Sequence, residues 1–226
     1  MDYESFFNLA KKRRSCWEFK SDPVPEDSIE KIVDVARYAP SGFNSQPWNF
    51  LVIRDQELRD TIVNFISGSN LPSGISSPGP FQMQPRPGKK DPMGFKAAPV
   101  FILVCGDTRV KSFGPPGLRK DSKKFMEILI SSLAISLQYM HLAAASMGLA
   151  TRWVSAVARP DIEPEIKKLF NIPEEFIVYE MMALGYSDFK PPPKKMRPLS
   201  EVLHFDKYCK KDFRTTEELK QYFSKK

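Results

Sequence analysis

Histidine is scarce in this chain of 226 residues, which contains only His141 and His204. The sequence also lacks HExxH, GxSxG, GxxxxGK[ST] and GxGxxG, the motifs of zinc proteases, serine hydrolases, P-loop proteins and dinucleotide-binding folds. We expect His141, within a long apolar segment, to be a core residue, and His204, in a proline-rich tail, to be exposed. Because the acidic residues show no catalytic spacing, the reactive group of an enzyme built on this chain would come from a cofactor.

Cysteine is equally sparse, with Cys16, Cys105 and Cys209 far apart and no CxxC pair. This spacing argues against a disulfide framework and against a metal site, and it favours a reducing compartment. No apolar leader follows Met1, and the longest apolar tract, 125–149, contains polar residues that a membrane span rarely carries. We therefore expect a cytoplasmic protein without a membrane partner.

The composition is that of a globular protein, with 42% hydrophobic residues and a net charge of +7. The length predicts one domain, 1–226. The charge favours an anionic partner but does not choose between phosphate ligands, nucleic acid and an acidic protein. Nucleic-acid binding ranks last because none of its usual modules is present. Irregular, proline-rich segments predict a lid or substrate loop at 67–95 and a C-terminal arm at 187–226.

Helical and strand patterns alternate without a strict βαβ rhythm, which favours an α+β fold. The longest expected helix, 120–147, is apolar all round and rich in small residues, as in a core or subunit-interface helix. The other expected helices are 3–12, 25–39, 55–66, 161–170 and 217–224. The expected strands are 49–54, 98–106, 150–157 and 176–185.

The basic run KKRRS at 11–15 offers two guanidinium forks and a hydroxyl, from Arg13, Arg14 and Ser15, to one phosphate. By itself, such a run is more typical of an exposed basic turn than of a binding site. The loop PSGFNSQPW at 40–48 favours a binding site, because its glycine permits close backbone approach and several polar side chains follow one another.

Two further pairs of polar residues strengthen this interpretation. Thr151 and Ser155 lie four residues apart in an expected strand and would share one face. Lys195 and Arg197 lie two apart in the arm and could meet one anion. Together with the basic run and the loop, they predict a mononucleotide-like ligand.

Several segments of the chain, in order and spacing, resemble the nitroreductase superfamily of FMN-dependent oxidoreductases over about 6–202. They are RRSCWEF, VPEDSIEKIVDVARYAPSGFNSQPWNFLVI, GLATRW, MALGY and KKMRPLSEV. The resemblance implies a central, mostly antiparallel sheet flanked by helices. It also implies an obligate homodimer built on the long helix, with FMN at the subunit interface and the C-terminal arm on the partner.

The resemblance further implies which residues contact the cofactor. Those at the FMN phosphate would be Arg13, Arg14, Ser15, Lys195 and Arg197. Those reaching the flavin from the other subunit would be Pro40, Ser41, Gly42, Asn44 and Gln46. Those beside the ring would be Thr151, Arg152, Trp153, Ser155 and Gly185, with Ser155 facing flavin N5.

Trp17 departs from the family pattern, which commonly has Arg or Lys two residues after this serine, near flavin N1 and O2. Arg152 and Lys96 are candidates to replace the missing cation. Without a replacement the flavin would be hard to reduce, because a charge-assisted contact of this kind is worth roughly 1.5–3 kcal/mol.

The implied reaction is a ping-pong transfer in which NADH or NADPH reduces FMN and a second substrate then takes a hydride from N5. The substrate would be a nitroaromatic, a quinone or a related small electrophile. The side chains expected to shape its pocket are Phe43, Phe81, Met83, Phe95 and Phe113. The alternatives are a reductive dehalogenase, an FMN-consuming enzyme like dimethylbenzimidazole synthase, and a non-enzymatic FMN carrier or sensor.

Overall fold

A computed structural model describes residues 2–68, 91, 93–208 and 213–224. The chain divides into two compact units, Met1–Pro191 and Pro192–Lys226. The division falls inside the segment 187–226 that the sequence predicts to be an arm.

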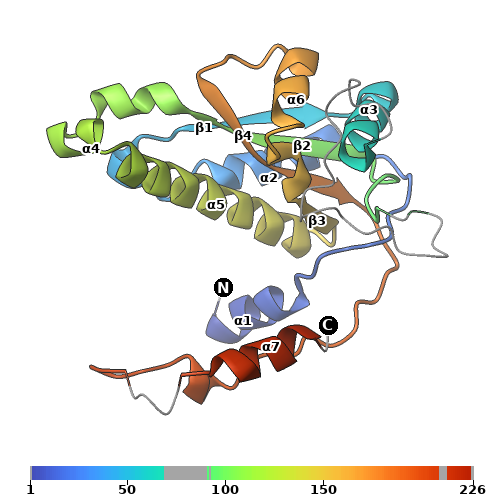
Figure 1. Cartoon of the computed structure of the whole chain (residues 1–226). Coiled ribbons are helices and arrows are strands. Elements are labelled where there is room, and N and C mark those ends of the chain that lie inside the picture. The colour runs from blue at the N-terminus through green and yellow to red at the C-terminus, as the bar shows by residue number, and fades with distance from the viewer. Residues whose placement is uncertain (1, 69–90, 92, 209–212, 225–226) are drawn as a thin grey trace. The chain divides into compact units, whose positions relative to one another are not determined.

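The first unit is built on a four-stranded antiparallel sheet with the strand order β1-β2-β4-β3. The strands are β1 Trp48–Ile53, β2 Val100–Asp107, β3 Ala150–Val154 and β4 Phe176–Gly185. β2 and β4 lie at the centre and are buried on both faces, which explains their nearly continuous apolar sequences (Figure 1). The predicted α+β class and antiparallel sheet are confirmed, and β3 is left at an edge.

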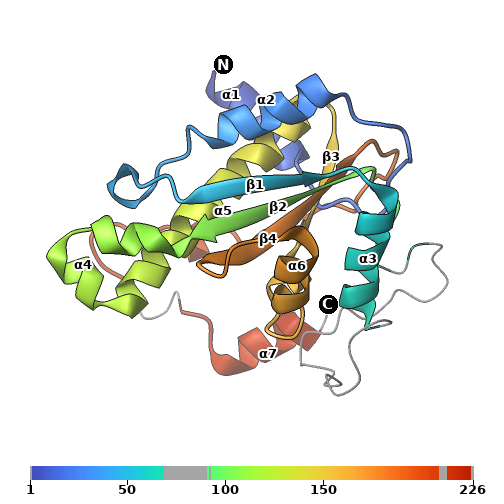
Figure 2. The same cartoon turned by 90° about the horizontal axis from the view of Figure 1, so that it is seen from above.

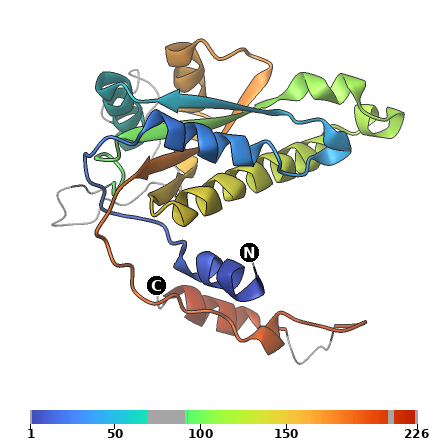
Figure 3. The ribbon, with the colours of Figure 1, turned by 180° about the vertical axis from the view of Figure 1, so that it is seen from behind.

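Two helices, α2 Glu26–Ala36 and α5 Ser122–Ser146, pack against each other on one face of the sheet (Figure 3). Their apolar positions meet the sheet in a core that includes Ile32, Leu133 and Met182. The opposite face carries α3 Gln56–Ser67 and α6 Glu163–Phe170 over a second core (Figure 2). The sheet is therefore covered on both faces.

α5 has a buried face and an exposed stripe. Leu129, Leu133 and Met140 are buried against the sheet, whereas Ile130 and Ser131 face outward. Among the described residues it is the one helix long and apolar enough to cross a membrane, a test that core helices also pass. Its packing on the sheet is that of a core helix.

The end of one predicted strand is wrong. The strand expected at 150–157 ends at Val154, and the next residues form a 3-10 turn, η3 Ser155–Ala158. Thr151 and Ser155 therefore do not share a strand face. The helix expected at 120–147 is confirmed as α5, which begins where the Asp121 carboxylate caps it by accepting from the Lys124 N–H at 2.8 Å. A short helix that was not expected, α4 Pro116–Lys120, precedes it.

Helices at the two ends of the chain expose apolar surface. α1 Tyr3–Lys12, in the first unit, has no buried residue and exposes Phe6 and Phe7. The second unit contains η4 Leu199–Glu201 and α7 Thr216–Ser224, and none of its described residues is buried. Its exposed apolar residues include Met196, Leu199, Phe205, Tyr208 and Phe223.

Candidate functional site

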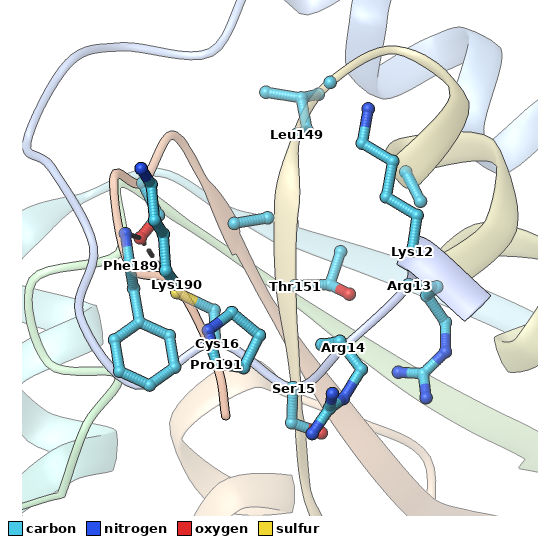
Figure 4. Close-up of a pocket in the computed structure, with 14 residues that line it drawn as sticks. Lys12, Arg13, Arg14, Ser15, Cys16, Leu149, Thr151, Phe189, Lys190 and Pro191 are labelled. Carbon is cyan, nitrogen blue, oxygen red and sulfur yellow. Dashed lines mark hydrogen bonds between the residues drawn. The ribbon is translucent and has the colours of Figure 1, made fainter. Parts of the chain in front are cut away.

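A basic pocket of about 320 Å³ lies where the end of α1, the end of α5 and the segment after β4 meet (Figure 4). Lys12, Arg13 and Arg14 line one side, Lys190 lies across from them, and Thr151 stands between them on β3. No acidic side chain belongs to the described lining. The pocket therefore suits an anion.

The backbone places the basic run in this pocket by leaving the helix. Arg13 ends α1 in an extended conformation, and Ser15 then forms a parallel bridge with Thr151. The Cys16 N–H donates to the Thr151 carbonyl at 2.8 Å, and the buried Cys16 thiol lies 3.1 Å from the Ser187 hydroxyl. The run is thus fixed along the free edge of β3 instead of forming a loose turn.

The positive charges in the pocket repel one another. Burial and the neighbouring Arg14 lower the pKa of Arg13, so the two guanidiniums gain from an anion between them. Burial, with a contribution from Arg13, also lowers the pKa of His141 to about 4. His141 is 2% exposed, and its Nδ1 lies 2.8 Å from the Thr151 hydroxyl, as expected of a core histidine.

The loop after α2 has a strained backbone. Phe43, Asn44 and Gln46 have φ values of 58°, 51° and 44°, a left-handed region that non-glycine residues seldom adopt. The Ser41 hydroxyl accepts from the Gln46 N–H at 3.0 Å and holds the turn, whose centre is η1 Gly42–Asn44. Strain of this kind tends to persist at functional sites.

The loop is fixed to the first half of α5. The Gly42 N–H donates to the Ser132 hydroxyl at 3.2 Å, and a Cβ at Gly42 would overlap the Ile128 side chain. The basic pocket instead includes Ala145, near the end of α5. At 1.5 Å per residue, Ile128 and Ala145 lie about 25 Å apart along the helix. One chain therefore does not bring the loop and the basic pocket together.

An apolar pocket of about 340 Å³ adjoins the loop. It lies between η1, α4, α5 and the 3-10 segment η2 Thr108–Phe113, and it brings together two of the predicted substrate residues, Phe43 and Phe113. Both phenyl rings are exposed, and no ionisable side chain belongs to the described lining. The pocket suits a neutral aromatic group.

The residues expected beside the flavin ring lie along β3 and just after it. Arg152 is 4% exposed and stacks on Trp17, with 3.3 Å between the guanidinium carbon and the ring centroid. Trp153 is half exposed and donates a hydrogen bond to Glu180, a carboxylate whose pKa burial raises to about 7. Ser155 is exposed at the start of η3.

The remaining predicted residues lie elsewhere. Phe95 is fully buried and meets the Phe101 ring edge-on at 5.8 Å, so it is a core residue and not part of a substrate pocket. Phe81 and Met83 lie outside the described residues. Lys195 and Arg197 belong to the second unit, where the Arg197 Nη2 donates to the Glu201 carbonyl at 2.7 Å. Gly185 ends β4 against Pro99.

Sequence reasoning missed three polar residues of this region. Lys12 belongs to the basic run itself, and Lys190 directly precedes three prolines in the predicted arm, so both were visible as cations. Glu180 could have been found as the one acid inside the apolar strand FIVYEMMALG. In the described part of the chain, no group of three or more histidine, cysteine or acidic side chains could hold a metal ion.

Residues 10–186 match the profile of the nitroreductase family. A relative from Methanothermobacter thermautotrophicus, named "Putative NADH dehydrogenase/NAD(P)H nitroreductase", is 30% identical over 78% of this chain and 74% of its own length. Iodotyrosine deiodinase from Thermotoga neapolitana is 28% identical over 87% of this chain and 95% of its own length.

Solved structures share the fold. The NADPH:FMN oxidoreductase from Vibrio harveyi, complexed with NAD+, has a TM-score of 0.72 and 20% identity, covering 97% of this chain and 83% of that one. The fold and the sequence match together define the class of protein as an oxidoreductase. The chain belongs to the nitroreductase family.

Proposed function

We propose that this oxidoreductase takes a hydride from NAD(P)H onto FMN and passes it to a nitroaromatic, a quinone or a related small electrophile. The observation that carries the proposal is the acid-free basic pocket that Arg13, Arg14 and Ser15 form at the edge of β3. A phosphate monoester is the anion whose geometry and charge best match two adjacent guanidinium forks and a hydroxyl.

The residues present fit FMN in a specific way. Arg13, Arg14 and Lys190 would hold its phosphate, and the exposed Ser155 would donate to the ring from the far end of β3. Ser155 follows Thr151 by four positions, which corresponds to about 13 Å of extended chain. This distance is comparable to the length of the ribityl phosphate with part of the ring. When bound, FMN supplies the electron-transfer chemistry, so no side chain has to act as a strong acid or base.

A homodimer accounts for the separation between the loop and the basic pocket. If two copies pair through antiparallel α5 helices, the loop 40–46 of one copy lies near the basic pocket of the other. The outer stripe of α5 supports such pairing, because Ile130 is exposed beside the small residues Ser131 and Ala134. The exposed apolar residues of α1 and of the second unit are further surface that a second copy would cover.

The apolar pocket supports neutral aromatic acceptors. Phe43 and Phe113 would stack on such a ring, and no charged group in the described lining would recognise an amino-acid zwitterion. Reductive dehalogenation is the second candidate, because the deiodinase of Thermotoga neapolitana is similar over most of its length and Ser155 offers a hydroxyl. A dehalogenase acting on a neutral haloaromatic would also suit the pocket.

The test is an absorption spectrum of the purified protein before and after anaerobic addition of NADH, and separately of NADPH. We expect a flavin spectrum that one nucleotide bleaches and that a nitroaromatic or quinone restores. Restoration only by a haloaromatic, with halide release, would favour the second candidate. Loss of the flavin in air without an acceptor would indicate an FMN-consuming enzyme.

Two outcomes would contradict the proposal. A protein that stays yellow with both nucleotides would be a carrier or sensor. A colourless protein that cannot be reloaded with FMN would show that KKRRS is an ordinary basic turn.

A further inference from the structure

The Arg152 side chain is an unusual feature of this fold, because a guanidinium is rarely buried to this extent. Arg152 is 4% exposed, although it lies on β3, the edge strand. Desolvating a guanidinium is costly, so its position needs surroundings that favour it.

Among the described residues, Trp17, Phe95 and Gly94 lie against the guanidinium. The Trp17 ring stacks on it at 3.3 Å, and the Phe95 ring centroid lies 5.6 Å from it. Gly94, at φ 71°, completes the enclosure, because a Cβ there would overlap both Arg152 and Trp17. Cation–π contacts with a tryptophan are worth most when the cation is desolvated, as here.

The segment that carries Trp17 runs beside β3. Ser15 is bridged to Thr151, and Cys16 donates to the same residue, so Trp17 and Arg152 follow directly from the wall of the basic pocket. A flavin ring extending from that pocket towards Ser155 would pass Arg152. Lys96, the other cation considered for this role, is half exposed and lies 3.9 Å from the Asp60 carboxylate.

We propose that Arg152, held by Trp17 and Gly94, is the cation that stabilises the reduced cofactor in this chain. Reduction of FMN by two electrons and one proton leaves a negative charge on the N1–O2 side of its ring, and a fixed positive charge nearby favours that state. The Arg152 guanidinium, carried by β3, would supply this positive charge, because the neighbouring segment has Trp17 and no cation there. This inference rests on the proposed binding of FMN.

The experiment is a measurement of the FMN midpoint potential in the Arg152→Gln holoprotein, by anaerobic reduction against a reference dye. We expect the variant to lose about tenfold in affinity for reduced relative to oxidised FMN, which corresponds to a fall of about 30 mV for a two-electron couple. In the double variant Trp17→Arg with Arg152→Gln, a cation returns to the site, and we expect most of the loss to be recovered.

Lys96→Met is the matched control, because it removes an equal charge from the exposed site, and its potential should equal that of the wild type. If circular dichroism shows that Arg152→Gln does not fold, Gly94→Ala decides, because it displaces the guanidinium without removing the charge, and it should also lower the potential. An unchanged potential in the folded variant overturns this inference alone. A wild-type protein that binds no FMN overturns the proposed function.

Discussion

Arg13 is the residue on which the phosphate assignment depends most directly, since it ends α1 and faces the pocket beside Arg14. We expect Arg13→Ala to weaken FMN binding by roughly 10- to 150-fold, because a hydrogen bond to a charged group is worth about 1.5–3 kcal/mol. Titration of apoprotein with FMN, followed by flavin fluorescence, measures the change.

Arg54→Ala serves as the control for this variant. Arg54 is half exposed and pairs with Glu26 at 3.1 Å, and a surface ion pair contributes little. Equal weakening in both variants would show that net charge, and not the geometry of the pocket, drives binding.

Glu180 gives a prediction about pH. Its pKa in the folded state is raised to about 7, and one carboxylate oxygen is buried without a hydrogen-bond partner among the described residues. The unfolded chain loses this proton near pH 4.5, so stability falls as the pH rises from about 4.5 to 7. Glu180→Gln should therefore raise the free energy of unfolding by about 1–3 kcal/mol at pH 8 and hardly at all at pH 4.5.

Urea denaturation of both proteins at the two pH values tests this. A gain of equal size at pH 4.5 and pH 8 would mean that better packing, and not the removed charge, stabilises the variant.

Single residues differ in how far the sequence could predict them. The sequence predicted that Arg13, Arg14 and Ser15 act as a group, because the three are adjacent, and the structure places all of them in the lining of one basic pocket. The burial of Arg152 was not, because it depends on Gly94 and Phe95, which are far from it in the sequence and meet it only in the folded chain. For the same reason Phe95 was wrongly expected to face a substrate.

At the scale of elements, the type of each predicted helix and strand followed from its sequence pattern, whereas the end of β3 did not. The segment 150–157 stays rich in apolar residues past Val154, yet β3 ends at Val154, whose register partner is Met181. Farther along β4 a bulge shifts its register against β2 between Val104 and Cys105. Such a shift depends on pairing between strands and leaves no mark in the pattern of either one.

The loop 40–46 offers a prediction about element packing. Gly42→Ala should destabilise the protein by about 1–3 kcal/mol, because the added Cβ overlaps Ile128 on α5. Ile128→Ala removes the side chain that the new Cβ would overlap. Gly42→Ala should therefore cost less stability in the Ile128→Ala protein than in the wild type. Urea unfolding of the four proteins in a double-mutant cycle measures the coupling. If the two substitutions change the free energy of unfolding additively, residues 42 and 128 do not interact.

At the scale of the whole molecule, the dimer can be tested on the outer stripe of α5. Ser131 is exposed and its hydroxyl donates to the Glu127 carbonyl, so Ser131→Arg should not disturb the fold of one chain. The bulky cation should block a close approach of two α5 helices and lower the mass in solution from two chains of 25.8 kDa to one. Light scattering coupled to gel filtration measures the mass.

Ser67→Arg is the matched control, because Ser67 is an exposed helical serine whose hydroxyl donates to the Asn64 carbonyl. It should leave the mass unchanged. If Ser131→Arg keeps the mass of two chains, the dimer interface does not include this stripe.

The antiparallel sheet flanked by helices was predicted through the resemblance to a known family, whereas the strand order β1-β2-β4-β3 was not predicted. The sequence predicted an arm from 187 on its proline-rich composition, and the structure divides the chain nearby, after Pro191. The residue at which the division falls was not predictable, because a boundary between compact units depends on contacts across the whole chain.

The loop and the basic pocket of one chain lie about 25 Å apart, and this separation predicts complementation between mutant chains. If each complete site combines one chain's pocket with the other chain's loop, two differently damaged chains can complement each other. Arg13→Ala would spoil one half-site and Ser41→Arg the other, so each homodimer would be inactive. In a mixed dimer both lesions fall on the same site, and the second site is intact. Unfolding and refolding the two inactive proteins together in equal amounts should restore about a quarter of the wild-type activity.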